Sequence, residues 1–168
     1  AAGFEDVEEV ERRLTSMRQS TRYRSLTATA RGRLDRLMPW LLADAGATDN
    51  PDATLGRLLG LLEAVARRSV YLSLLAENVA ARERLVELCA ASAWIAGFVT
   101  RHPILLDELI DPNSLYEPAD RAGLTAEIDT ALEGIDTEAL EAQMDTLRQI
   151  KQTNVLRVAA ADITERLP

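Results

Sequence analysis

The segment from Ala53 to Ala76 constrains the fold of this sequence more than any other part. Leucine, valine and alanine recur through it at helical spacing, and from Val70 to Leu75 apolar residues occur almost all round the expected helix. A helix without a polar face must be enclosed by other helices. The segment therefore predicts the central helix of a bundle.

Residue types that cap helices divide the rest of the chain into further helical segments, and no segment reads as a convincing strand. Asp6, Asn78 and Ser92 can each cap a helix N terminus, and Gly46 and Gly134 can each end a helix. The expected helices span residues 7–19, 27–45, 53–76, 79–91, 93–101, 103–111, 119–133 and 137–166, with an irregular connector at 112–119. The sequence predicts an all-α fold, a multi-helix bundle of about eight helices.

The last expected helix, 137–166, is the longest, with Thr137 as its candidate cap. Its length is ~45 Å at a rise of 1.5 Å per residue. An apolar stripe follows one of its faces, made of Leu140, Met144, Leu147, Val155, Val158 and Ile163. A helix this long either spans the bundle or leaves it to join a neighbouring domain.

The size of the chain, 168 residues, fits one domain with a core of its own. Apolar residues make up 47% of the sequence and aromatic residues only 4%, so aliphatic side chains must fill that core. We expect a single helical domain over 1–168, with N-terminal helices in 1–46, a central bundle in 52–112, and a connector and long helix in 113–168. Because the sequence lacks an initiator Met and stops within a helical pattern, we interpret it as a piece of a longer protein.

The cellular location is predicted from cysteine usage and hydropathy. Cys89 is the single cysteine and has no partner for a disulfide within the chain, which suits a reducing cytoplasm. No apolar run approaches the ~20 residues that a membrane helix needs, so we expect no membrane partner.

Charge is distributed unevenly along the sequence. The formal net charge of −8 argues against nucleic acid as a partner. Between Arg18 and Arg36 six arginines stand against one acid, but Tyr23 is the only aromatic residue among them, unlike a nucleic-acid surface. Between Asp107 and Asp145 twelve acids stand against one arginine.

No catalytic constellation is recognisable in the sequence. The eight glycines are scattered singly, so no phosphate-binding glycine loop occurs, and one histidine with one cysteine cannot form a His- or Cys-rich metal site. We therefore assign no catalytic, cofactor-binding or metal-binding residue.

The best candidate for an interface is the stretch from Arg101 to Pro112, in which two prolines enclose a short acidic helix. His102, before Pro103, more often caps carbonyls or packs than acts as a base. Asp107 and Asp111 are expected four residues apart on one helical face, with Glu108 beside them. A solvated face or pairing with arginine is favoured over a cation site, which needs more ligands.

Arg67 and Arg68 are further candidate interface residues. They lie inside the otherwise apolar 53–76 segment. A surface ion pair from Glu63 to Arg67, four residues apart on one helix, is the simpler interpretation. The alternative is that one arginine reaches a neighbouring domain or the acidic residues at 107–108.

Residues 71–116 contain the patterns Y-L-x-L-L-x-E-N, R-L-V-E-L-C-A-x-S and R-H-P-I-L-L-D-E-L-I-D-P, followed by L-Y. Together with residues 143–163 and, more weakly, 31–39, they resemble the bacterial glutamine synthetase adenylyltransferase/adenylyl-removing enzymes. The resemblance covers most of the chain in the family's order.

This resemblance implies a large cytoplasmic parent enzyme with two nucleotidyltransferase domains, which use ATP and magnesium. One domain attaches AMP to a tyrosine of glutamine synthetase and the other removes it, under control of the PII protein and glutamine. The family's Gly-Ser and D-x-D motifs match no residue here.

Two hypotheses follow from the resemblance. In the first, the chain is the non-catalytic central helical linker or regulatory domain, with the two nucleotidyltransferase domains of the same chain as neighbours. In the second, it is a docking module that binds PII or glutamine synthetase through the acidic 107–145 surface or the arginine cluster. A standalone enzyme is a poor third, because acid, base and nucleophile are not paired.

Overall fold

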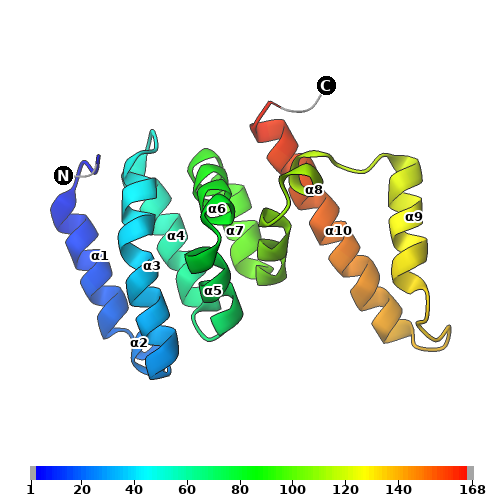
Figure 1. Cartoon of the computed structure of the whole chain (residues 1–168), viewed down its shortest axis with the longest axis horizontal. Coiled ribbons are helices and arrows are strands. Elements are labelled where there is room, and N and C mark those ends of the chain that lie inside the picture. Colours follow the sequence, from blue (N-terminus) through cyan, green and yellow to red (C-terminus); the bar gives the residue numbers. More distant parts are fainter. Residues whose placement is uncertain (1–2, 166–168) are drawn as a thin grey trace. The chain divides into compact units, whose positions relative to one another are not determined.

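The computed structural model describes residues 3–165 and is all-α over that range, as predicted (Figure 1). The helices are α1 (Val7–Gln19), α2 (Thr21–Arg24), α3 (Ala28–Gly46), α4 (Pro51–Val65), α5 (Ser69–Glu77), α6 (Val79–Ala91), α7 (Ala93–Arg101), the 3-10 helix η1 (Pro103–Leu109), α8 (Pro112–Tyr116), α9 (Arg121–Leu132) and α10 (Leu140–Ile163). The chain divides into two compact units, Ala1–Ile110 (unit 1) and Asp111–Pro168 (unit 2). The division falls inside the Arg101–Pro112 stretch.

The capping side chains explain why four helices begin where the sequence predicts. The Asp6 carboxylate accepts from the Glu9 N–H at 2.8 Å, and the Asn78 amide oxygen accepts from the Ala81 N–H at 2.9 Å. The hydroxyls of Thr27 and Ser92 cap α3 and α7 in the same way. Each cap satisfies an N–H group that has no partner within its helix.

Helix α4 is the central element of unit 1 and contacts α1, α3, α5, α6 and α7. Its apolar side chains are almost completely buried, namely Leu55, Leu58, Leu59, Leu61, Leu62 and Val65. The prediction of an enclosed central helix is therefore confirmed for this part of the 53–76 segment.

The same segment is not one continuous helix, so that part of the prediction was wrong. Helix α4 ends at Val65 and α5 begins at Ser69, with the Arg68 N–H donating to the Val65 carbonyl at 2.7 Å across the turn. Arg67 and Arg68 are both exposed in this turn. Guanidinium groups are costly to bury without partners, so the chain turns where they meet solvent. Val70 is consequently 66% exposed rather than enclosed.

A buried arginine joins three helices of unit 1. Arg82 on α6 is only 7% exposed, and its Nε donates to the Asp44 carboxylate on α3 at 2.8 Å. Its guanidinium also lies 5.1 Å from the centre of the Trp40 ring, and one of its nitrogens donates to the Leu75 carbonyl of α5 at 3.4 Å. Pairing of this kind is what makes a buried charge tolerable.

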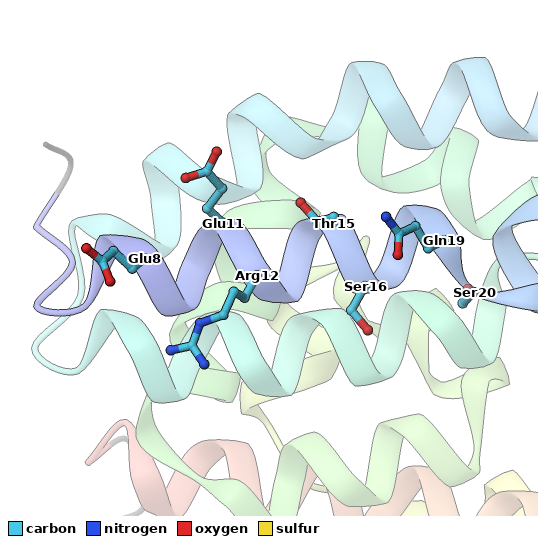
Figure 2. A pocket seen from close by; sticks show the side chains of 7 residues that line it. All are labelled: Glu8, Glu11, Arg12, Thr15, Ser16, Gln19 and Ser20. Atoms are coloured by element: carbon cyan, nitrogen blue, oxygen red, sulfur yellow. The ribbon is translucent and has the colours of Figure 1, made fainter.

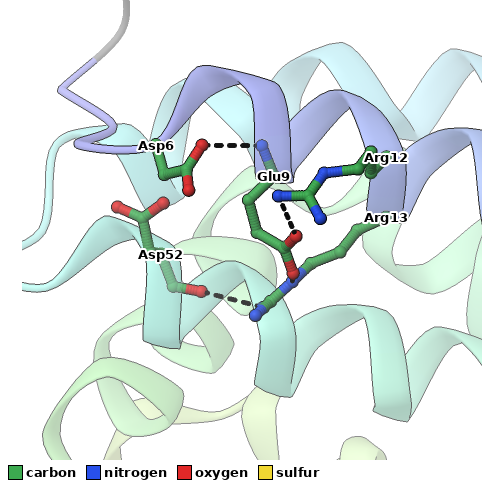
Figure 3. A network of polar contacts seen from close by, with 5 residues as sticks. All are labelled: Asp6, Glu9, Arg12, Arg13 and Asp52. Atoms are coloured by element: carbon green, nitrogen blue, oxygen red, sulfur yellow. Dashed lines mark hydrogen bonds and ion pairs between the residues drawn. The ribbon is translucent and has the colours of Figure 1, made fainter.

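Polar contacts also attach α1 to α4 (Figure 3). The Arg13 side chain bonds Glu9 on its own helix at 2.6 Å and donates to the Asp52 carbonyl at 3.4 Å. The Asp52 carboxylate accepts from the Glu5 N–H at 3.0 Å. A Cβ atom on Gly56 would lie 2.6 Å from an Arg13 nitrogen, so a larger residue here would displace the end of this side chain where it crosses α4.

Unit 2 consists of α8, α9 and α10, and α10 contacts both of the others. Its described buried residues lie on α8 and α10, namely Leu115, Tyr116, Ile150, Thr153, Leu156, Ala160 and Ala161. No described residue of α9 is fully buried. Asn154 donates to the Glu127 carboxylate at 2.9 Å and holds α9 against α10.

Two predictions for unit 2 need correction. Residues 112–119 are not wholly irregular, because Asp111 caps the short helix α8. Thr137 does not cap the last helix, since α10 begins at Leu140 with no side-chain cap. The expected end at Arg166 lies outside the described residues. The predicted apolar stripe is largely exposed, and the buried face of α10 carries Thr153 and Leu156.

Candidate functional site

The Arg101–Pro112 stretch is a tight corner built by helix ends. Helix α7 ends at Arg101, and the His102 N–H donates to the carbonyls of Phe98 at 3.0 Å and Val99 at 3.2 Å. Pro103 then opens η1, whose side chains Leu105, Leu106 and Leu109 are fully buried. The sequence predicted a short helix here. The structure makes it a 3-10 helix.

Arg84 of α6 fastens the end of the corner, although the sequence did not single it out. One of its terminal nitrogens donates to the Leu109 carbonyl and, at 3.1 Å, to the Ile110 carbonyl. These carbonyls lie at the C-terminal end of η1, where backbone acceptors lack partners within the helix. Arg84 stands among other charges in the sequence, so no local signal distinguishes it.

His102 is a packing residue in this geometry. Its ring meets Phe98 edge-on at 5.1 Å between ring centres, and Phe98 stacks on Trp94 at 5.0 Å. The three rings lie four residues apart along one side of α7 and the residue after it. Arg101 is exposed, and one of its nitrogens lies 3.4 Å from where a Cβ on Gly97 would be, so its side chain folds back along α7.

The three carboxylates of the corner do not converge on one point. Asp107 lies on η1, but Asp111 lies beyond its end and caps α8, accepting from the Asn113 N–H at 2.9 Å. The prediction that Asp107 and Asp111 share a helical face was wrong. Partial burial raises the pKa of Asp107, and the negative charge of Glu108 raises it further. Among residues 3–165 no three His, Cys, Asp or Glu side chains are grouped to hold a metal ion.

Arg67 and Arg68 lie elsewhere in unit 1, at the turn between α4 and α5. Arg67 donates to the Ser25 hydroxyl at 3.5 Å, on the segment between α2 and α3. Because Arg67 lies outside α4, it is not four residues along the same helix from Glu63.

Two surface depressions of unit 1 lie away from both candidate regions. One, of about 680 Å³, is lined by side chains of α1 and of Ser20 after it, among them Glu8, Arg12 and Gln19 (Figure 2). Another, of about 540 Å³, lies between the end of α3 and α6 and is lined by Asp44, Thr48 and Glu83, among others. Both are open to solvent and neither is an enclosed ligand site. The described helices include none with the length and apolar character needed to cross a membrane.

Comparison with known proteins places the chain in a family. A family model described as glutamate-ammonia ligase adenylyltransferase matches residues 82–168. Proteins named bifunctional glutamine synthetase adenylyltransferase/adenylyl-removing enzyme are similar to the chain. The one from Thioalkalivibrio sulfidiphilus is 52% identical over 99% of the chain, and the one from Nitrosococcus oceani is 50% identical over 100%. That from Pseudomonas putida is 47% identical over 99%.

The chain spans 17% of the length of each of these relatives. The family match covers the C-terminal half of the chain, and the relatives match nearly all of it. The chain therefore belongs to the glutamate-ammonia ligase adenylyltransferase family.

Proposed function

We propose that this chain is a non-catalytic central helical domain of an enzyme that adenylylates and deadenylylates glutamine synthetase. In this proposal it links the two nucleotidyltransferase domains of one cytoplasmic polypeptide and helps to regulate them. The names of the relatives, and the small share of their length that the chain spans, support it.

The observation that carries the proposal is that charged side chains of the candidate region are used to complete helix ends. Within unit 1, Arg84 donates to the carbonyls of Leu109 and Ile110, and within unit 2 the Asp111 carboxylate caps α8. These side chains satisfy backbone groups that have no partner within a helix. Such use suits a structural domain better than a catalytic one.

ATP and magnesium belong, in this proposal, to the catalytic domains of the full-length enzyme. We assign neither of them to the carboxylates at 107–111, because Asp111 is engaged at α8 while Asp107 lies on a separate helix. We assign no chemical step to these residues.

The test compares two arginine variants in the full-length enzyme. Arg84→Met should leave both basal activities measurable but change how the ratio of adenylyl transfer to adenylyl removal responds to PII and glutamine. Arg101→Met, which changes an exposed arginine of the same corner, should leave the response unchanged. An unchanged response in Arg84→Met would contradict the regulatory role, and ATP turnover by the isolated chain would contradict the non-catalytic one.

A second candidate function is direct docking of PII or glutamine synthetase on the acidic 107–145 surface. Asp129, Glu133 and Asp136 are exposed there, whereas the arginine cluster is partly engaged internally, with Arg18 3.7 Å from Asp35. Calorimetry with the isolated chain separates the two functions. Binding at micromolar protein would favour docking, and no heat of binding would favour the linker.

A further inference from the structure

Helix α10 has two apolar faces, and unit 2 covers only one of them. The covered face carries Ile150, Leu156 and Ala160, which are buried against α8 and α9. The other face carries Leu140, Met144, Leu147 and Val158, which we call the outer stripe. Their exposed fractions are 65%, 58%, 40% and 48%.

The outer stripe is a true face of the helix rather than a scatter of exposed residues. At 100° per residue, its four side chains fall within roughly 60° of one another and roughly 130° from the centre of the buried face. Lys151 lies within the stripe between Leu147 and Val158 and is exposed. A surface helix of a self-contained domain has polar residues opposite its buried face. Large apolar side chains gathered there are typical of an interaction surface.

Unit 2 also has a small core for the length of its helices. No described residue of α9 is fully buried, and the half of α10 from Leu140 to Gln149 has none. Covering the outer stripe would remove that apolar surface from water, at roughly 25 cal/mol per Å² of apolar area.

The net charge of unit 2 bears on which occupant is favoured. Residues 111–165 contain twelve acids and four basic residues, and Glu141 is exposed beside the stripe, while Lys151 lies within it and Arg148 pairs with Asp145. A second copy would bring one net acidic unit against another, and like charges in an interface are unfavourable. The favoured occupant is an apolar surface with basic residues at its margins.

We infer that another part of the full-length enzyme's own polypeptide covers the outer stripe with such a surface. This inference rests on the proposed function. The chain is 17% of the length of its relatives, so most of their polypeptide lies outside the described region. A surface on the same polypeptide has a high effective concentration, which lets a contact of modest area persist.

Cysteine footprinting tests the inference. Met144→Cys places a thiol in the outer stripe, and Asp145→Cys places one at the next residue, which is similarly exposed but points away from the stripe. Cys89 is buried and gives little background. Alkylation is followed peptide by peptide with mass spectrometry, in the 168-residue chain and in the full-length enzyme.

In the 168-residue chain both new thiols should react at similar, fast rates. In the full-length enzyme the alkylation rate of Met144→Cys should fall at least about tenfold, which corresponds to ~1.4 kcal/mol of local opening free energy. The alkylation rate of Asp145→Cys should change little. Leu140→Cys serves as a second stripe position should Met144→Cys lose helicity.

Equal rates in both proteins would overturn the inference, and so would protection already present in the 168-residue chain. Sedimentation at several concentrations would then show whether a second copy is responsible. The regulatory response of the Arg84→Met variant is a separate measurement, so the proposed function can stand or fail independently of this result.

Discussion

At the residue scale, the helices of unit 1 are joined by arginine side chains. Arg57 of α4 donates to the carbonyls of Cys89 at 2.6 Å and Ala90 at 2.9 Å, near the end of α6. Arg82 and Arg84 make comparable contacts from α6, to Asp44 and to the end of η1. The long, forked side chain reaches backbone acceptors that have no helical partner. These contacts supplement a core that has few aromatic side chains.

Two glycines of α4 give a matched pair of predictions. Gly60→Ala should raise the free energy of unfolding by up to about 1 kcal/mol, because alanine is the better helix former and nothing lies within 4 Å of the new methyl group. Gly56→Ala gains the same helix propensity but displaces the Arg13 side chain, so its free energy of unfolding should rise by less. Urea unfolding of both variants measures the difference. A larger gain for Gly56→Ala would show that the Arg13 contact does not contribute.

The thiol of Cys89 should be inert in the folded protein. Burial raises its pKa to about 12, and the charge of Arg57 lowers it by less. Alkylation at pH 8 should therefore be slow in the native state and fast in urea. Rapid native labelling would contradict the buried position.

The same pKa shift predicts a pH dependence of stability. The unfolded thiol loses its proton near pH 8.5, whereas the folded thiol keeps it up to about pH 12, so the unfolded state binds fewer protons between these values. The contribution of Cys89 to stability should be complete below about pH 8.5 and decline as the pH rises toward 12. Cys89→Ala should flatten this part of the stability curve, measured by urea unfolding from pH 8 to 10.

At the scale of elements, the helix starts capped by Asp6, Asn78 and Ser92 were predictable, whereas the start of α10 and the helix interruptions were not. Asp6, Asn78 and Ser92 are recognisable caps because their side chains act within three residues. The break between α4 and α5 depends instead on where solvent meets Arg67 and Arg68. The corner residues were found in the sequence, but Arg84 was not, since it bonds carbonyls 25 and 26 residues away.

A pair of variants tests which arginine maintains the corner. Arg84→Met keeps the side-chain stem but loses the donors to the end of η1, and should lower the free energy of unfolding by about 1–3 kcal/mol. Amide exchange in residues 103–110 should speed up at the same time. Arg101→Met, at an exposed position, should change stability by about 0.5 kcal/mol or less. Equal effects of the two variants would contradict the role given to Arg84.

At the scale of the whole molecule, burial is divided unequally between the two units. Unit 1 has a central helix, α4, with buried apolar side chains along its length, whereas α9 of unit 2 has no fully buried described residue. Local stability follows buried apolar contact. We therefore expect unit 2 to be the less stable part of the isolated chain.

Hydrogen exchange of the 168-residue chain should show this difference directly. Amides of α9 and of α10 up to Gln149 should exchange faster than those of α4 and α6, and urea should unfold unit 2 at a lower concentration. A single transition with uniform protection would indicate that the two units unfold together. Slower exchange of α10 in the full-length enzyme would agree with coverage of the outer stripe.

The sequence by itself determined the all-α class, the starts of four helices, the burial of α4 and the family resemblance. These depend on periodicity and on caps a few residues apart, which are local properties of the chain. Only the tertiary structure decided that Asp111 belongs to unit 2, that Arg84 secures the corner, and that the outer stripe of α10 faces solvent. A helical pattern shows which residues share a face but not which face has a neighbour, because that depends on elements distant in the sequence.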